Sequence, residues 1–299
     1  MQEFAPDVVC LPLSIENVYF VGAPGRPWVL VDAGTPGKTG RIQAAAQERY
    51  GADARPEAIV LTHGHPDHSG SARALAESWG VPVYAHTLEL PYLTGRSKYP
   101  PGDPTVGGAL AALTRVFPTS VPDLSGVVQP LPAHGVVPGL PDWKWLDTPG
   151  HAPGHVSFFR QSDRILLTGD AFATVNLDSL PSLLTKKPEI SLPPTPITCD
   201  WPAADCSVQL LAGLGPSAVG CGHGRSLTGS HVATDLNRFA DGFAPPAHGR
   251  YVGHPAVTDE TGIVSLPPPA PDPFPLQAVI TLLAVGVAVT WATRRAAAE

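Results

Sequence analysis

The chain has 299 residues, of which 43% are hydrophobic and 15% charged, so it holds enough apolar side chains for one large core or two small ones. Its formal net charge of -7 gives no electrostatic attraction to a phosphate backbone, which argues against nucleic acid as a partner. The 36 prolines and 30 glycines punctuate apolar runs and are typical of turns in a folded protein.

Short β-type runs and helical segments alternate along most of the chain. Each predicted strand is apolar, rich in β-branched residues and followed by a turn. Strands are predicted at 28–32, 58–62, 81–85, 143–148, 156–160, 165–168 and 218–219. Helices are predicted at 40–50, 71–79 and from an N-cap at Asp200 to residue 211. This mixture favours an α/β (α+β) fold with helices packed outside layered sheets.

Two long stretches show no regular pattern. Residues 92–141 are rich in proline and glycine, with one helical patch at 106–116, and residues 180–198 are also broken by prolines. Long connections in a compact domain are often functional, as lids or pocket walls, and plain surface loops are the alternative.

The composition changes from residue 245 onward. Residues 245–275 are rich in proline and predict a stiff, extended linker after a catalytic domain at 1–244. Residues 276–293 contain no charged side chain, precede Arg294 and Arg295, and as a helix would reach roughly 27 Å. They predict a transmembrane helix, with a buried or partner-docked helix as the alternative.

The membrane orientation rests on two features. The arginine pair favours a cytoplasmic C-terminus, and the first residues lack the basic and apolar regions of a secretory signal. We therefore expect a catalytic domain that faces the cytoplasm, anchored by its C-terminus, or alternatively a soluble cytoplasmic protein.

The strongest chemical signal is His-Gly-His-Pro-Asp-His at residues 63–68. Three of the chain's 11 histidines and one aspartate occupy this window, directly after the predicted strand 58–62. Neutral imidazoles and a carboxylate suit zinc and related divalent ions, and such crowding of titratable groups is costly without a cation. The segment therefore predicts metal binding.

Three further donors each follow another predicted strand. His151 ends Thr-Pro-Gly-His, Asp170 follows Gly169, and His223 lies between two glycines. Each is weak evidence alone, but their shared place after strands allows one sheet edge to bring them together.

The order H-x-H-x-D-H, T-P-G-H-x-x-G-H, G-D and G-H-G resembles the metallo-β-lactamase-fold hydrolase superfamily, in its glyoxalase II-like branch, over residues 8–243. The resemblance implies an αββα sandwich with the site at one edge. It also implies two metal ions with these ligands: His63, His65 and His151 for the first, Asp67, His68 and His223 for the second, and Asp170 for both.

Other residues match supporting positions. Asp32, in Asp-Ala-Gly, matches the family's first motif and would orient metal-bound histidines, with a turn-capping role as the alternative. His155 matches the second histidine of the T-P-G-H motif, which we interpret as structural. His86 is expected to be a packed or hydrogen-bonded residue rather than a ligand.

The resemblance implies a hydrolase in which two metal ions, zinc first and iron or manganese otherwise, share a hydroxide that Asp67 orients. The intact Asp170 resembles the thioesterase, lactonase and phosphodiesterase branches more than true β-lactamases. We therefore expect a small-molecule ester, thioester or lactone as substrate. The alternatives are a phosphodiesterase, an iron-dependent oxidoreductase of the same fold such as a persulfide dioxygenase, and a non-catalytic binding module. The oligomeric state stays open.

Overall fold

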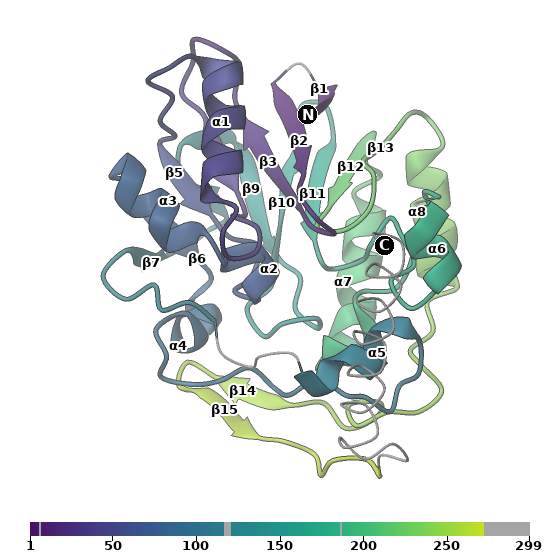
Figure 1. Ribbon diagram of the computed structural model, residues 1–299. Helices are drawn as coiled ribbons and strands as arrows, with labels where there is room; N and C mark the ends of the chain where they lie inside the picture. The colour runs from purple at the N-terminus through teal and green to yellow at the C-terminus, as the bar shows by residue number, and fades with distance from the viewer. Residues whose placement is uncertain (6, 117–120, 186, 272–299) are drawn as a thin grey trace, which may run out of the picture.

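The computed structural model describes residues 1–5, 7–116, 121–185 and 187–271 (Figure 1). The transmembrane helix predicted at 276–293 lies outside these described residues. Among the helices that are described, none has both the length and the apolar character needed to cross a bilayer.

The first sheet has seven strands that lie in chain order. They are β1 (Gln2–Ala5), β2 (Val8–Pro12), β3 (Asn17–Val21), β4 (Val29–Val31), β5 (Ala58–Val60), β6 (Val83–Ala85) and β7 (Val128–Pro130). Pairing is antiparallel from β1 to β4 and parallel from β4 to β7. Because β4 and β5 are parallel, the residues that follow them emerge at the same edge of the sheet.

The second sheet has six strands. In spatial order they are β13 (Leu227–Thr228), β12 (Ala218–Cys221), β11 (Ile165–Gly169), β10 (Val156–Arg160), β9 (Leu140–Asp147) and β8 (Val136–Val137). Strands β11 and β12 are parallel, and β9 runs in their direction because both it and β11 are antiparallel to β10. The carboxyl ends of β9, β11 and β12 therefore share one edge.

Helices cover the outer face of each sheet (Figure 1). The helices are α1 (Thr39–Tyr50), α2 (Pro66–Ser69), α3 (Ala72–Trp79), α4 (Leu90–Leu93), α5 (Ala109–Leu113), α6 (Leu180–Thr185), α7 (Trp201–Gly213) and α8 (Val232–Asp241). Single 3-10 turns occupy Thr87–Glu89, Thr114–Val116 and Thr195–Ile197. Helices α1 and α3 pack on the seven-stranded sheet, and α7 and α8 pack on the other.

Three apolar clusters hold these layers together. Val31 and Val60 of the first sheet pack against Phe158 of the second, and all three are fully buried. Ile42 of α1 joins the outer cluster on the first sheet, and Leu211 of α7 joins that on the second. Each such side chain contributes about 1.5–3 kcal/mol by leaving water. The result is the αββα sandwich that the resemblance implies.

Most predicted elements are confirmed, with shifted ends. The strand predicted at 28–32 ends at Val31, because Asp32 has a φ of 61°, in the left-handed region that a strand cannot use. The helical patch at 106–116 reduces to the short α5 and one 3-10 turn. Strands β1 to β3 and helix α8 were not predicted.

The segment predicted as an extended linker is described up to residue 271 and contains regular structure up to Ser265. It forms a hairpin of β14 (Val257–Asp259) and β15 (Gly262–Ser265). Tyr251 packs with Cys199 and Trp201 and donates its hydroxyl hydrogen bond to the Pro101 carbonyl at 2.7 Å. An apolar anchor of this kind holds the segment against the sandwich. The division at residues 244 and 275 stays a prediction.

An ion pair joins the two sheets and gives a pH-dependent prediction. Arg160 Nη2, at the end of β10, donates to Asp7 Oδ1 at 2.8 Å, and Nη1 donates to Asp7 Oδ2. These hydrogen bonds hold the pKa of Asp7 below its ordinary value of 3.8. A depressed pKa stabilises the fold above that value, and the contribution disappears as the pH falls below it.

We expect Asp7→Asn to lower the free energy of unfolding by about 1 kcal/mol at neutral pH, since the pair is only partly buried. The difference from the wild type should shrink once the pH falls below 3.8, because the unfolded wild-type chain then takes up a proton at Asp7 more readily than the folded one. Urea unfolding of both proteins at neutral pH and at a pH below 3.8 measures this. An equal difference at both would contradict the assignment.

Candidate metal centre

All seven predicted donors lie at one edge of the sandwich. The segment 63–68 follows β5, while His151, Asp170 and His223 follow β9, β11 and β12. Three sets of donors each have their ligand atoms within 4.8 Å of one another: His63, His65 and His151; His63, His68 and Asp170; and Asp67, His68 and His223. The first and third sets have the composition that the resemblance implies for the two ions.

The first set consists of three buried imidazoles. His63 Nε2 lies 3.0 Å from His65 Nδ1, which lies 2.9 Å from His151 Nε2. Burial lowers the pKa of His65 to about 4, and burial also holds the pKa values of His63 and His151 well below 6.5. The lowered pKa values favour neutral rings, the form of histidine that binds metals, and the ring nitrogens lie within 4.8 Å of one another.

The second set combines imidazoles with carboxylates. His223 Nε2 lies 3.4 Å from Asp67 Oδ2 and 3.2 Å from Asp170 Oδ2. Burial alone would lower the pKa of His223, but the negative charge of Asp170 raises it to about 10. Burial would raise the pKa of Asp170, but the charges of His223 and His68 hold it well below 3.8. This part of the site therefore contains ionised carboxylates, which nearby positive charge stabilises.

Two buried atoms at this point have no hydrogen-bond partner within the described chain, His68 Nε2 and Asp170 Oδ1. A buried polar atom left without a partner costs about 1–3 kcal/mol. A bound cation would satisfy both atoms, and nitrogen and carboxylate donors are the ligands of zinc and iron. The site therefore suits two divalent metal ions.

Asp32 contacts the donors from behind. Its Oδ2 lies 2.9 Å from His68 Nδ1, and its Oδ1 accepts a hydrogen bond from the Thr62 backbone N–H at 2.8 Å. The Thr62 hydroxyl lies 3.1 Å from His63 Nδ1. Asp32 thus links Thr62 to His68, and its orienting role stays a prediction.

His155 contacts the backbone of Asp170, and its structural role stays a prediction. Its Nε2 accepts a hydrogen bond from the Asp170 backbone N–H at 2.9 Å, and its Nδ1 lies 2.9 Å from the Thr148 hydroxyl. His86 lies apart from the donor sets, with Nε2 3.3 Å from Asp147 Oδ1. Its Nδ1 accepts a hydrogen bond from the Leu88 backbone N–H at 3.3 Å, so it is a hydrogen-bonded residue, as predicted.

Several supports were not predicted. His151 Nδ1 lies 3.3 Å from the Thr198 hydroxyl, and His223 Nδ1 lies 2.9 Å from the Ile15 carbonyl. Asn17, at the start of β3, donates to the carbonyls of Cys221 and Gly224 at 2.9 and 2.7 Å. A hydrogen bond to a backbone carbonyl cannot be predicted from a sequence pattern, because every residue has a backbone carbonyl.

Glu89 is the most connected of the supports that were missed. It is fully buried, and its Oε2 accepts from the Gly64 backbone N–H at 2.8 Å while its Oε1 accepts from the Gly154 N–H at 2.7 Å. The Tyr99 hydroxyl also donates to Oε2. Glu89 thus ties the loop of His63 and His65 to the loop that carries His151.

Gly222 allows the donors to approach one another, which gives a second prediction. A Cβ at this position would lie 2.1 Å from Asp170 Oδ1 and 2.6 Å from His68 Cε1. Gly222→Ala should therefore displace both side chains and lower metal affinity by about 10–100-fold while the chain still folds. Metal titration of the apoprotein measures this.

Gly40→Ala in α1 is the matched control, because a Cβ there meets no atom within 4 Å. It should leave metal affinity unchanged and raise the melting temperature slightly. Equal metal affinity in the two variants would show that Gly222 has no role in packing the donors.

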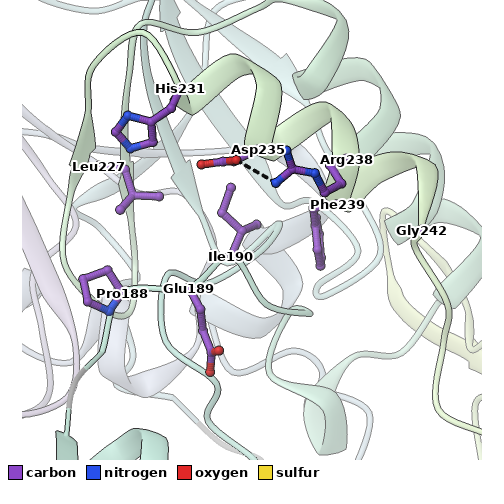
Figure 2. Close-up of a pocket in the computed structure, with 9 residues that line it drawn as sticks. All are labelled: Pro188, Glu189, Ile190, Leu227, His231, Asp235, Arg238, Phe239 and Gly242. Atoms are coloured by element: carbon purple, nitrogen blue, oxygen red, sulfur yellow. Dashed lines mark hydrogen bonds and ion pairs between the residues drawn. The ribbon is translucent and has the colours of Figure 1, made fainter.

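A cavity of about 260 Å³ opens beside the donors His65, Asp67 and His223. Figure 2 shows a second hollow, of about 610 Å³, bordered by α8 and residues 188–190. That hollow is lined by Pro188, Glu189, Ile190, Leu227, His231, Asp235, Arg238, Phe239 and Gly242. It includes none of the clustered donors, so the smaller cavity is the one at the metal centre.

The profile described as the metallo-beta-lactamase superfamily matches residues 11–223. The chain belongs to this superfamily. It is 43% identical over 242 residues to the probable metallo-hydrolase YflN of Bacillus subtilis (strain 168), over 80% of this chain and 92% of that protein. Because the chain belongs to this superfamily and is similar to this probable metallo-hydrolase over most of its length, we identify it as a metallo-hydrolase.

Solved structures of this fold are similar as well. One is TTHA1623 in a di-iron-bound form, at a TM-score of 0.51 and 29% identity, covering 78% of this chain and 96% of that one. Another is the B3 metallo-beta-lactamase BLEG-1, at a TM-score of 0.54 and 23% identity, with the same two coverages of 78% and 96%. The second likeness concerns the fold alone.

Proposed function

We propose that this metallo-hydrolase cleaves an ester, thioester or lactone of a small molecule, with two divalent metal ions held by the seven donors. The observation that carries the proposal is that the seven donors come together from the ends of four strands. Two of their buried atoms, His68 Nε2 and Asp170 Oδ1, have no hydrogen-bond partner within the described chain. We also propose that the protein belongs to the glyoxalase II-like branch of the superfamily, which its sequence motifs resemble.

The ligand assignment follows the two donor sets. His63, His65 and His151 would hold one ion; Asp67, His68 and His223 the other; and Asp170 both. When bound, the ions supply a water of lowered pKa and polarise the substrate's carbonyl oxygen. Among the acidic donors, Asp67 is the one that lines the cavity, with 22% of its side chain exposed, so its carboxylate is placed to accept a hydrogen bond from the attacking water.

Asp32 and His155 would position this machinery without touching substrate. Asp32 contacts Nδ1 of the His68 ring and would leave Nε2 for a metal ion, and His155 accepts a hydrogen bond from the Asp170 backbone N–H. A carboxylate on the far nitrogen of a metal ligand raises the ligand's basicity and sets its orientation.

An iron-dependent oxidoreductase is the alternative. The observation that favours it is the di-iron form of the 29% identical TTHA1623, since the same donors accept iron. Metal analysis and dioxygen uptake separate the two functions. We propose zinc as the native metal of the hydrolase.

The test is a panel of ester, thioester, lactone, lactam and phosphodiester probes on the purified protein, together with metal analysis. We expect two zinc ions per chain and turnover of the carbonyl ester probes, lost on chelation and restored by zinc. Turnover that survives complete metal removal would contradict the proposal. Cleavage of phosphodiesters alone would contradict the substrate class, and iron with dioxygen uptake would support the oxidoreductase.

A further inference from the structure

The cavity beside the metal centre is almost entirely apolar. Besides the donors it is lined by Ile15, Thr35, Pro66, Tyr99, Pro100, Gly102, Leu110, Leu177, Pro194 and Ile197. No lysine or arginine occurs among these described lining residues. Away from the metal donors, a substrate that enters the cavity therefore meets mainly hydrocarbon.

The two hydroxyl groups in the lining are already engaged. Thr35 Oγ1 donates to the carboxylate of Glu16 at 2.9 Å, and the Tyr99 hydroxyl donates to the buried Glu89. Neither hydroxyl proton is therefore available to an anionic group on the substrate.

The apolar wall is fixed by the fold. Leu110 lies on α5, and the backbone N–H of its neighbour Ala109 donates to the Asp178 carbonyl at 2.9 Å. The Asp178 carboxylate accepts from the Thr195 hydroxyl at 2.8 Å, which ties α5 to the segment that carries Ile197. The two irregular stretches of the sequence thus meet here as pocket walls.

We propose that the substrate of this site is uncharged on its acyl side and carries a short hydrocarbon chain that fills the cavity; this rests on the proposed hydrolytic function. Each buried methylene should raise affinity for the site about fourfold. A carboxylate on the chain would be buried without a partner cation, which is strongly unfavourable. The volume of about 260 Å³ lies below that of most drug-sized pockets and sets the limit on chain length.

The first test uses the full-length holoenzyme with p-nitrophenyl acetate, butyrate and hexanoate, and with the adipate half-ester as the charged counterpart of hexanoate. We expect kcat/KM to rise about fourfold per methylene until the cavity is full. The terminal carboxylate should lower kcat/KM about 100-fold relative to hexanoate. A flat series, or equal turnover of the charged ester, would overturn the proposal.

The second test moves charge into the wall. Leu110→Arg should abolish the preference for the hexanoate ester over the acetate ester. It should also make the adipate half-ester a better substrate than the hexanoate ester, which is the reverse of the wild-type preference. Leu113→Arg is the matched control on the same helix, since Leu113 is 42% exposed and does not line the cavity. It should keep the wild-type preferences. Circular dichroism of both variants checks that they fold.

Binding is measured separately from cleavage, by calorimetry with unreactive n-alkyl amides and their carboxylate-terminated counterparts. If affinity rises with chain length while no ester is cleaved, the hydrolytic function is wrong and the assignment of the cavity stands. If affinity does not depend on chain length, or the carboxylate binds equally well, the assignment of the cavity is wrong whatever the turnover.

Discussion

Asp170→Ala is expected to remove nearly all turnover and to deplete bound metal. Asp170 Oδ2 lies 3.5 Å from both His68 Nε2 and His151 Nε2 and 3.2 Å from His223 Nε2, so this one carboxylate reaches both donor sets. Loss of a residue that only supports a metal ligand costs about 10–100-fold, and loss of the donor proposed to bind both ions should exceed this. The measurements are kcat on the best ester probe and metal per chain.

The control is Asp53→Asn, which changes an exposed aspartate in the turn after α1 and should alter neither quantity. Asp170→Asn keeps the shape of the side chain but removes its charge, so it should retain more metal than Asp170→Ala and still turn over slowly. A protein with Asp170→Ala that kept full turnover and full metal content would exclude the proposed ligand set.

The donors could be predicted from the sequence because their signal is local. A buried strand is a short apolar run, and a histidine or aspartate directly after it must emerge at a sheet edge. Parallel neighbours then bring distant residues together at one edge of each sheet: β4 and β5 bring Asp32 to the segment 63–68, and β11 and β12 bring Asp170 to His223. The residue types alone indicated a metal.

Glu89 and the supporting backbone carbonyls could not be predicted, because their partners are distant in sequence and lack a local pattern. Glu89 follows a predicted strand like the donors, yet its partners Gly64 and Gly154 contribute only backbone N–H groups. The role of Ile15 likewise depends on its carbonyl. The two irregular stretches that line the cavity, 92–141 and 180–198, could be recognised as long connections. Which of their side chains face the cavity depends on contacts distant in sequence, such as that between Asp178 and Thr195.

The fold of the segment after residue 245 also depends on contacts that the sequence pattern does not reveal. Its prolines are typical of an extended linker, and composition does not reveal that Tyr251 packs with Trp201. Strands β1 to β3 form an antiparallel meander whose buried residues run without alternation, as in Val8 to Leu11, because β2 and β3 are covered on both faces. Such runs do not by themselves distinguish a strand from a buried helix.

Glu89→Ala is expected to destabilise the protein and weaken metal binding together. Two buried donors, the Gly154 backbone N–H and the Tyr99 hydroxyl, would lose their acceptor at a cost of about 1–3 kcal/mol each. The Gly64 backbone N–H would keep only its hydrogen bond of 3.0 Å to the Tyr99 hydroxyl oxygen. The free energy of unfolding should therefore fall by about 2–6 kcal/mol. Because these groups fix the loops of His65 and His151, metal affinity should also fall about 10–100-fold.

Glu89→Gln separates the two effects. The amide keeps one acceptor oxygen, which can serve Gly64 or Gly154, and presents N–H groups to the other. Stability and metal affinity should therefore fall between those of the wild type and Glu89→Ala. Glu77→Ala is the control, since its exposed pairing with Arg73 at 3.0 Å contributes less than about 1 kcal/mol. Wild-type metal affinity in both Glu89 variants would mean that the donor loops hold their geometry without this carboxylate, and that the metals alone organise the site.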